Sequence, residues 1–343
     1  MAEATAPAAA FDAAKKRRHW PPELNALIGL IGIAIIFELL GWAVRDQSFF
    51  GNLTRLKIMI LQVSIIGIIA IGVTQVIISG GIDLSSGSVV GATAMISMSF
   101  AQVGTYDKAV FLEQGWVDLP VVIPLAVGFG CGILAGFING SLIAYTGIPP
   151  FIATLGMMVS ARGVASWWTK GKPVSFPTDQ FAAIGEGMTP VFIFLCVLVL
   201  FYLILRFTVY GKHTYAIGSN EDAARMSGIN VERHKVLVYT IAGALAGLAA
   251  MVLAARGLTA QAGMGIMYEL DAIAMSVIGG VSLSGGRGSV VGTAIGMLIF
   301  GVIISGFTFL RIDAFFQEML KGGIIVAAVV ADVYRQRRRA MES

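Results

Sequence analysis

The chain has 343 residues, of which 57% are hydrophobic and only 13% are charged, and its mean hydropathy is +0.82. A soluble globular fold cannot cover that much apolar surface, so the composition excludes the soluble classes and predicts a membrane protein. The formal net charge of +4 does not indicate nucleic-acid binding, because Lys and Arg gather beside apolar segments instead of forming one basic face.

The N-terminal segment carries a basic cluster at residues 15–18 and leads into an apolar run from Leu24 to Val44. The run is long enough to cross a bilayer, which takes about 20 residues. Because no Ala-x-Ala cleavage site ends it, we expect a retained first helix and not a signal peptide. Residues 1–23 are then a cytoplasmic N-terminal tail.

Apolar runs continue along the chain and predict an all-α polytopic membrane protein with about ten transmembrane helices. An even number of spans returns the C-terminus to the side of the N-terminus. The basic tail 335–343 also favours the cytoplasm, so residues 24–334 form the transmembrane domain. The expected spans are 24–44, 58–79, 87–104, 120–146, 150–168, 190–209, 235–256, 268–283, 289–307 and 315–334.

A Gly- and Ser-rich segment interrupts the apolar sequence twice. Residues 80–91 (GGIDLSSGSVVG) return in closely similar form as residues 279–292 (GGVSLSGGRGSVVG). Breaks repeated in the two halves of a membrane protein are typical of discontinuous helices around a central translocation path. The repeat therefore predicts a transporter, while the relative orientation of the two halves stays open.

Polar groups at membrane depth are costly unless protein or water surrounds them, so they are candidates for lining the path. Asp83 could instead cap the helix that follows the break. The equivalent residue in the second copy is Ser282, which is also a good capping residue. Glu269 and Asp271 are two residues apart and point to different faces of a helix, so we expect at most one to touch the path. The path candidates are Gln75, Gly80, Gly81, Asp83, Ser85, Asn139, Glu269, Asp271, Ser282 and Ser284.

A polar loop, residues 210–235, separates the sixth and seventh spans and carries another basic cluster. Ser219 or Asn220 can cap a short helix there, and Gly228 can end it. The helix is either an ordinary connector or a lever that docks into another protein. We expect substitution of Glu221 or Arg225 to uncouple transport without preventing insertion. The candidate coupling residues are Asn220, Glu221, Ala224, Arg225 and Gly228.

Three motifs in order resemble the permease subunit of ribose-type sugar importers of the ATP-binding-cassette (ABC) class. They are the segment 80–88, the loop 218–229 (GSNEDAARMSGI), and the run 268–274 (YELDAIA) leading into the second break. The resemblance extends from about residue 25 to 335, and residues 305–309 are slightly more similar to inositol-type members.

The resemblance implies a bacterial inner-membrane importer of two permease subunits, a cytoplasmic ATPase and a periplasmic sugar-binding protein. The chain has no Gly-x-x-x-x-Gly-Lys-Ser/Thr phosphate loop, so we expect it to bind no cofactor and the partner to hydrolyse ATP. The loop 218–231 would then be the coupling helix. A pentose, a hexose or myo-inositol remain open as substrates, as do a homodimer and a pair of different permeases.

Two other functions explain less of the sequence. An ion-coupled secondary sugar transporter accounts for the breaks but not for the loop. A membrane-embedded enzyme lacks candidates, because the three His residues all lie at cytoplasmic ends and no spacing predicts a catalytic or metal site.

Overall fold

The structure, a computed structural model, describes residues 22–342 and is almost entirely helical. Its elements are α1 (Pro22–Arg45), α2 (Leu53–Ile78), α3 (Ser86–Ser99), α4 (Val122–Thr146), α5 (Pro150–Trp168), β1 (Val174–Ser175), α6 (Asp179–Ala182), η1 (Ala183–Gly185), α7 (Thr189–Phe207), α8 (Val209–Ser219), α9 (Glu221–Met226), α10 (Val231–Gly257), β2 (Thr259–Ala260), α11 (Tyr268–Ile278), α12 (Val290–Phe309) and α13 (Ala314–Glu342). The expected all-α polytopic membrane fold is confirmed.

Each of the ten expected spans falls on a helix, although the lengths differ. Within residues 22–342, seven helices are long and apolar enough to cross a membrane, namely α1, α2, α4, α7, α10, α12 and α13. The spans expected at 87–104 and 268–283 were too long, because α3 already ends at Ser99 and α11 at Ile278. Both short helices adjoin a glycine-rich break, where the chain leaves the helical conformation.

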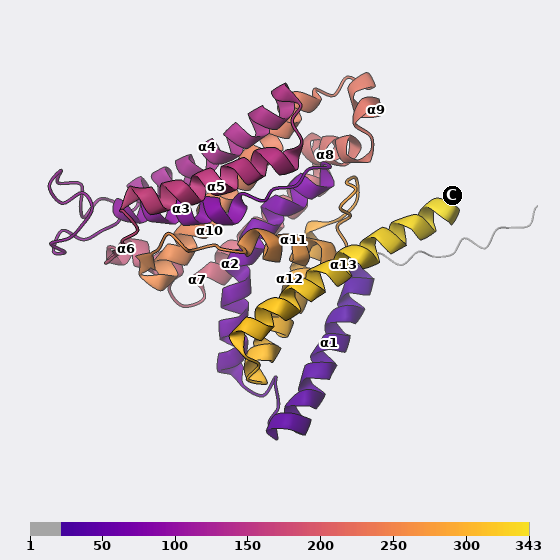
Figure 1. Ribbon diagram of the computed structural model, residues 1–343, viewed down its shortest axis with the longest axis horizontal. Coiled ribbons are helices and arrows are strands. Elements are labelled where there is room, and N and C mark those ends of the chain that lie inside the picture. Colours follow the sequence, from indigo (N-terminus) through magenta and orange to yellow (C-terminus); the bar gives the residue numbers. More distant parts are fainter. Residues whose placement is uncertain (1–21, 343) are drawn as a thin grey trace, which may run out of the picture.

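Helix α2 forms the centre of the molecule. Every residue from Val63 to Ile78 is buried, which is the behaviour of a helix that is apolar on all sides. Three polar residues, Ser64, Thr74 and Gln75, lie in this buried stretch. Thr74 Oγ1 lies 3.0 Å from Ser276 Oγ of α11 and 2.7 Å from Thr293 Oγ1 of α12. Figure 1 shows α2, α10 and α11 in the middle, with α3, α4 and α5 on one side and α1, α12 and α13 on the other.

Helices α4 and α10 pack at backbone contact through a stripe of glycines on α4. A Cβ atom on Gly132 would lie 2.3 Å from the carbonyl oxygen of Gly243, and one on Gly136 would lie 2.2 Å from that of Tyr239. Small residues allow this approach and provide the main van der Waals contact between membrane helices. Gly128 and Gly140 continue the stripe, which therefore serves packing within one subunit.

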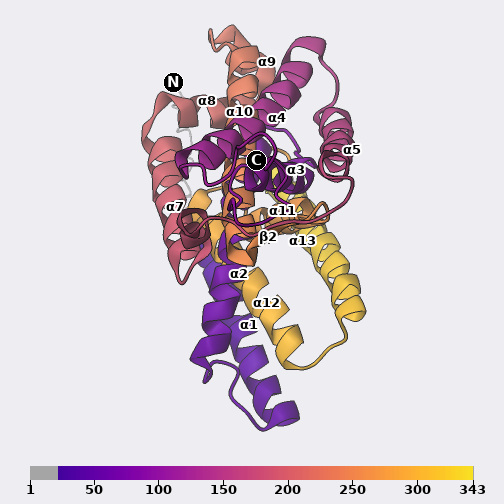
Figure 2. The same ribbon diagram turned by 90° about the vertical axis from the view of Figure 1, so that its left-hand side faces the viewer.

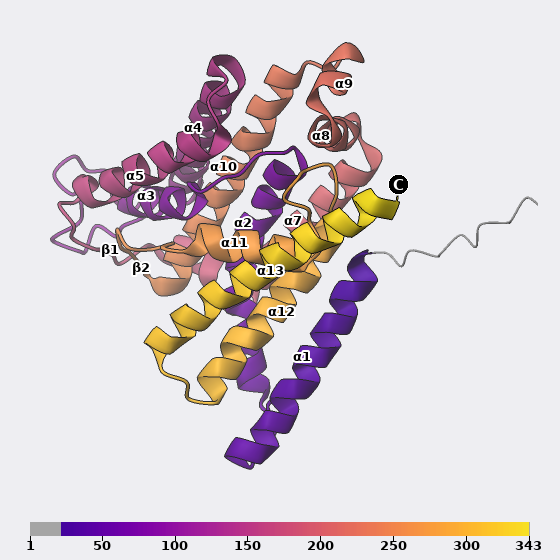
Figure 3. The ribbon, with the colours of Figure 1, turned by 45° about the vertical axis from the view of Figure 1, so that its right-hand side comes forward.

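The short strands tie two connections together at the end of the molecule away from α9 (Figure 3). Val174 pairs with Ala260 and Ser175 with Thr259 in antiparallel register. The Ser175 and Thr259 hydroxyls are also 2.7 Å apart. The segment after α5 is thereby fixed to the segment after α10.

The peripheral helices α1 and α13 extend beyond the expected limits of the membrane domain. Helix α1 begins at Pro22, and the rest of the expected N-terminal tail lies outside the described residues. Helix α13 continues to Glu342, so most of the expected C-terminal tail is helical, since its Arg, Gln, Ala, Met and Glu residues favour that state. Figure 2 shows α7 and α13 on opposite sides of the molecule.

The glycine stripe predicts that Gly136→Ala destabilises the protein. The added methyl group would collide with α10 backbone and force the helices apart, at a cost of about 1–3 kcal/mol. The thermal unfolding midpoint in detergent should fall. Gly130→Ala on the same helix is the matched control, because its methyl group would meet nothing within 4 Å. Equal midpoints for both variants would contradict this packing.

Candidate functional site

The first break separates α2 from α3 and depends on two adjacent glycines. Gly80 has a φ of +84°, in the left-handed region that glycine adopts without steric cost. Gly81 lies against a side chain of α10, since a Cβ atom there would be 2.3 Å from Tyr239 Oη. The chain therefore leaves the helix at Ile78 and re-enters it at Ser86.

Asp83 organises this break through a buried chain of polar groups. Its Oδ1 accepts hydrogen bonds from the Ser85 backbone N–H at 2.8 Å and from the Ser85 hydroxyl at 2.6 Å. Asn139 of α4 donates its Nδ2 to the same hydroxyl oxygen at 2.9 Å. Asp83 thus accepts a backbone N–H just before α3, but it stands two residues ahead of the N-cap position, which is Ser85.

The second break joins α11 to α12 by a longer turn. Ser289 is the N-cap of α12, where its Oγ accepts from the Gly292 N–H at 3.0 Å and donates to Glu23 of α1 at 2.7 Å. The expectation that Ser282 is the equivalent cap was wrong. The second copy is longer than the first, at residues 279–292 against 80–91, and in the added turn the Ser282 N–H donates to the Arg287 carbonyl at 3.1 Å.

The two breaks touch each other, and the C-terminal turn of α8 touches both. The Gly286 N–H donates to the Ile78 carbonyl at 2.8 Å. A Cβ atom on Gly218 would lie 1.7 Å from the same carbonyl oxygen, and one on Gly285 would lie 3.0 Å from Gly80 Cα. We call these five residues the glycine junction. It is backbone against backbone, so the three segments cannot move past one another independently.

Tyr215 adds a side-chain contact between α8 and the second break. Its hydroxyl donates to the Gly288 carbonyl at 2.9 Å. Burial raises the pKa of this hydroxyl, and the charge of Glu23 adds to the effect, so the group stays protonated and able to donate. The sequence did not single out Tyr215, Gly218 or Ser289 as linking residues.

The polar loop forms a helical hairpin, α8 followed by α9, at one end of the molecule (Figure 1). Asn220 caps α9 as expected, because its Oδ1 accepts from the Ala223 N–H at 2.9 Å. Gly228 follows the helix with a φ of +83°, so it ends the hairpin as its residue type predicts. Asn230 caps α10 in the same way by accepting from the Arg233 N–H at 2.9 Å.

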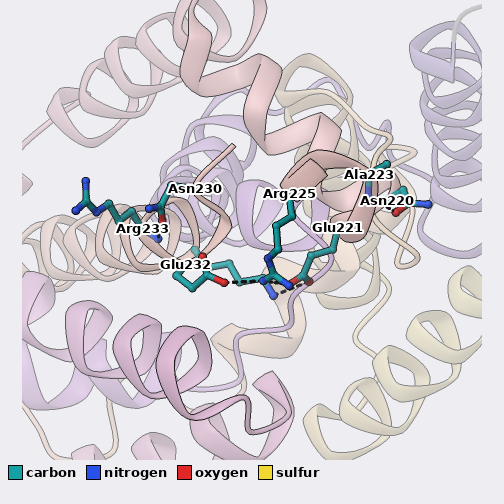
Figure 4. Close-up of polar contacts among 8 residues, drawn as sticks. Asn220, Glu221, Ala223, Arg225, Asn230, Glu232 and Arg233 are labelled. Carbon is teal, nitrogen blue, oxygen red and sulfur yellow. Dashed lines mark hydrogen bonds and ion pairs between the residues drawn. The ribbon is translucent and has the colours of Figure 1, made fainter. Parts of the chain in front are cut away.

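An ion-pair network fixes α9 to the start of α10 (Figure 4). Arg225 Nη2 lies 2.6 Å from Glu232 Oε1 and 3.4 Å from Glu221 Oε1. Lys235 Nζ lies 2.7 Å from Glu221 Oε2. Single exposed pairs contribute about 0–1 kcal/mol, but four alternating charges that share partners hold the orientation of a short helix better than one pair does.

The two faces of α9 differ in burial. Ala224 packs with Ile217 and Val231 in a small apolar cluster that seats the hairpin. Met226 is 84% exposed at the end of the helix. An exposed flexible thioether is suited to filling a groove on a partner, and the sequence did not identify it.

The remaining path candidates lie in different surroundings. Gln75 is fully buried, and its Oε1 accepts from the Tyr210 hydroxyl at 2.7 Å. Ser282 and Ser284 lie in the second break, the first buried and the second exposed. Gly80 and Gly81 line a cavity of about 250 Å³ beside Lys235.

Glu269 and Asp271 face separate cavities, as their spacing predicts. Asp271 lines one of about 510 Å³ between α2, α11, α12 and α13, together with Lys321 and Arg55. Glu269 lines one of about 410 Å³ beside α5, together with Arg162. All ten path candidates stay predictions. The part of the chain that the structure describes holds no group of His, Cys, Asp and Glu suited to a metal ion.

The fold and the site define a multi-pass transport permease. Residues 56–329 match the family described as "Branched-chain amino acid transport system / permease component", and the chain belongs to this family. No solved structure matches the chain.

Relatives similar over nearly the whole chain are import permeases. The galactose/methyl galactoside import permease protein of Haemophilus influenzae is 37% identical over 317 residues, 89% of this chain and 94% of the relative. The ribose import permease proteins of Escherichia coli and Bacillus subtilis are 36% and 38% identical, each over 93% of this chain and 96% of the relative. The expected membership of the ABC importer permeases is confirmed.

The glycine junction predicts that Gly218→Ala separates α8 from the breaks. The new methyl group would overlap the Ile78 carbonyl oxygen and displace it, so the Gly286 N–H should lose its hydrogen-bond acceptor. Losing one such hydrogen bond should lower the hydrogen-exchange protection of Gly286 by about tenfold.

Hydrogen exchange followed by mass spectrometry across residues 279–289 measures this protection. Gly156→Ala on α5, where a methyl group would meet nothing within 4 Å, is the control and should leave exchange unchanged. Unaltered protection in Gly218→Ala would show that the junction is not held by this contact.

Proposed function

We propose that this chain conducts a monosaccharide or related polyol from the periplasm to the cytoplasm through the bacterial inner membrane. The names of its relatives support a sugar, since those reported above import ribose or galactose. The family description names branched-chain amino acids, whereas the relatives that are similar over nearly their full length are named for sugars. A pentose and a hexose are therefore the first substrates to test, with myo-inositol next.

The energy comes from a separate cytoplasmic ATPase of the ABC class that docks on α9. The observation that supports this best is the path from α9 to the membrane: the ion-pair network links α9 to α10, and α8 contacts both breaks at the glycine junction. Displacement of α9 by a partner would move the backbone of both breaks. The chain itself binds no cofactor in this proposal, and ATP is bound and hydrolysed by the ATPase.

The α8–α9 hairpin and both termini face the cytoplasm in this arrangement. Basic residues of the hairpin region support that side, because cytoplasmic loops carry an excess of Lys and Arg. The opposite face, which includes the paired strands β1 and β2, receives a periplasmic sugar-binding protein. A second permease copy completes the assembly, and the exposed apolar face of α13 is available to it or to lipid.

Reconstitution of the chain in proteoliposomes tests the function. Uptake of labelled ribose, galactose and myo-inositol is measured with and without ATP, an ATPase subunit and a sugar-binding protein. We expect uptake only with all components, and leucine serves as the contrasting substrate. Uptake by the chain alone under an ion gradient would support a secondary transporter and overturn the proposal.

The exposed methionine predicts where the ATPase docks. Met226→Asp should weaken binding of the ATPase at least about tenfold, since buried anchor residues at interfaces typically contribute more than 1 kcal/mol. Because Met226 is 84% exposed, the stability of the isolated permease should not change. Pull-down of the ATPase and ATP-driven uptake are the measurements.

Two variants give the comparison. Met226→Leu should retain binding, because it keeps the apolar volume. Arg225→Gln removes the contacts with Glu221 and Glu232, so it should reduce uptake per ATP hydrolysed while the ATPase still binds. Equal binding by Met226→Asp and the unmodified chain would place the docking surface elsewhere.

A further inference from the structure

A mostly apolar cavity of about 410 Å³ that also holds charged groups lies beside the first turns of α3, apart from the glycine junction. It is bounded by α5 and by the segment between α10 and α11. Its lining includes Ser88, Met158, Arg162, Ser166, Ile266 and Glu269. Charged, hydroxyl and apolar groups thus meet around one space.

Glu269 is the most unusual group in this cavity. Its side chain is only 7% exposed, and its Oε2 has no hydrogen-bond partner within the described residues. The carboxylate lies directly against α3, since a Cβ atom on Gly87 would be 1.9 Å from Oε2. A buried carboxylate oxygen without a donor is costly and calls for a ligand or water.

Arg162 stands one helical turn away from this carboxylate. A Cβ atom on Gly91 would be 2.8 Å from Arg162 Nη1, and Gly87 and Gly91 are neighbours on one face of α3, about 6 Å apart. The guanidinium donates from Nη1 to the carbonyls of Ala262 and Met264, at 2.5 and 2.8 Å. No ion pair within 4 Å joins Arg162 to Glu269 in residues 22–342, so the two charges face the cavity without closing on each other.

Arg162 of α5 reaches across to the segment that follows α10. Its Nη1 group donates to backbone carbonyls of that segment, which leaves Nε and Nη2 able to donate to other acceptors. A guanidinium has five donors, of which the Nη1 group uses two here.

This pairing selects a class of ligand. An anion would be repelled by Glu269 and a cation by Arg162, whereas a sugar hydroxyl can donate to a carboxylate and accept from a guanidinium. Ser88 and Ser166 offer further hydroxyls, and Met158 and Ile266 offer apolar surface for C–H groups. A zwitterionic amino acid is the rival, because it carries both charges.

The open side of the cavity is the exposed face of α5, where Val159 is 65% exposed. Buried charges cannot open onto lipid, so this face meets water or protein in the working assembly. We infer that Glu269 and Arg162 form a contact site for the hydroxyls of the transported sugar on its way through the permease, an inference that rests on the proposed function.

Cysteine protection in the assembled importer tests this site. Ser166→Cys is introduced with Cys131→Ala and Cys196→Ala, and labelling by a charged water-soluble thiosulfonate is timed with increasing ribose, galactose or leucine. We expect the transported sugar to slow labelling and leucine to have no effect. Val164→Cys, on α5 but not lining the cavity, is the control and should not be protected.

The Glu269→Gln variant then distinguishes a direct contact between the sugar and Glu269 from protection caused by a general closure of the cavity. It keeps the size of the side chain but removes the charge, and the sugar concentration that halves labelling should rise about tenfold, as for the loss of one charge-assisted hydrogen bond. Glu269→Asp should restore part of the protection. If Glu269→Gln fails to assemble, the Ser166→Cys measurement on native Glu269 decides the matter alone.

The outcomes distinguish the site from the function. Sugar uptake with no protection of Ser166→Cys, or with equal protection at Val164→Cys, overturns the site and leaves the importer intact. Protection by leucine and not by sugar overturns the ligand class. Absence of uptake for every sugar in the unmodified importer overturns the proposed function itself.

Discussion

The structure depends on the need to satisfy backbone polar groups where helices are interrupted inside a bilayer. Non-helical backbone at that depth is tolerated only where protein or water surrounds it. Here the two breaks meet this requirement with each other, because the Gly286 N–H of one donates to the Ile78 carbonyl of the other. The approach requires glycine in the second break, since a Cβ atom on Gly285 would lie 3.0 Å from Gly80 Cα, and Gly218 brings α8 to the same point.

The glycine junction that packs the two breaks together is therefore also the point where the α8–α9 hairpin contacts them. The backbone contact at Gly218 transmits displacement directly, because no side-chain rotamer lies between the two backbones to absorb it. The ion pairs of Glu221, Arg225 and Lys235 hold the other end of the hairpin. Between these two ends, α8 and α9 form a short rigid link from a cytoplasmic surface to the interrupted helices.

Local sequence signals predicted much of the fold and part of the site. Apolar runs located the helices, the glycine pairs located both breaks, and Asn220 and Gly228 marked the limits of the hairpin, because these features depend on neighbouring residues only. Contacts between distant segments could not be predicted in this way. The repeat aligns Ser282 with Asp83 and does not reveal the extra turn that makes Ser289 the cap of α12. The pairing of α8 with both breaks has no periodic signal either.

The central position of α2 has a consequence for how the protein is made. Helix α2 is synthesised early, yet Thr74 finds its hydroxyl partners on Ser276 and Thr293, which are more than 200 positions later in the chain. Until α11 and α12 emerge, this apolar helix must reside in lipid with its hydroxyl bonded to its own backbone or to water. Hydropathy therefore serves insertion, whereas Thr74 gains its side-chain partners only when the last third of the protein has entered the membrane.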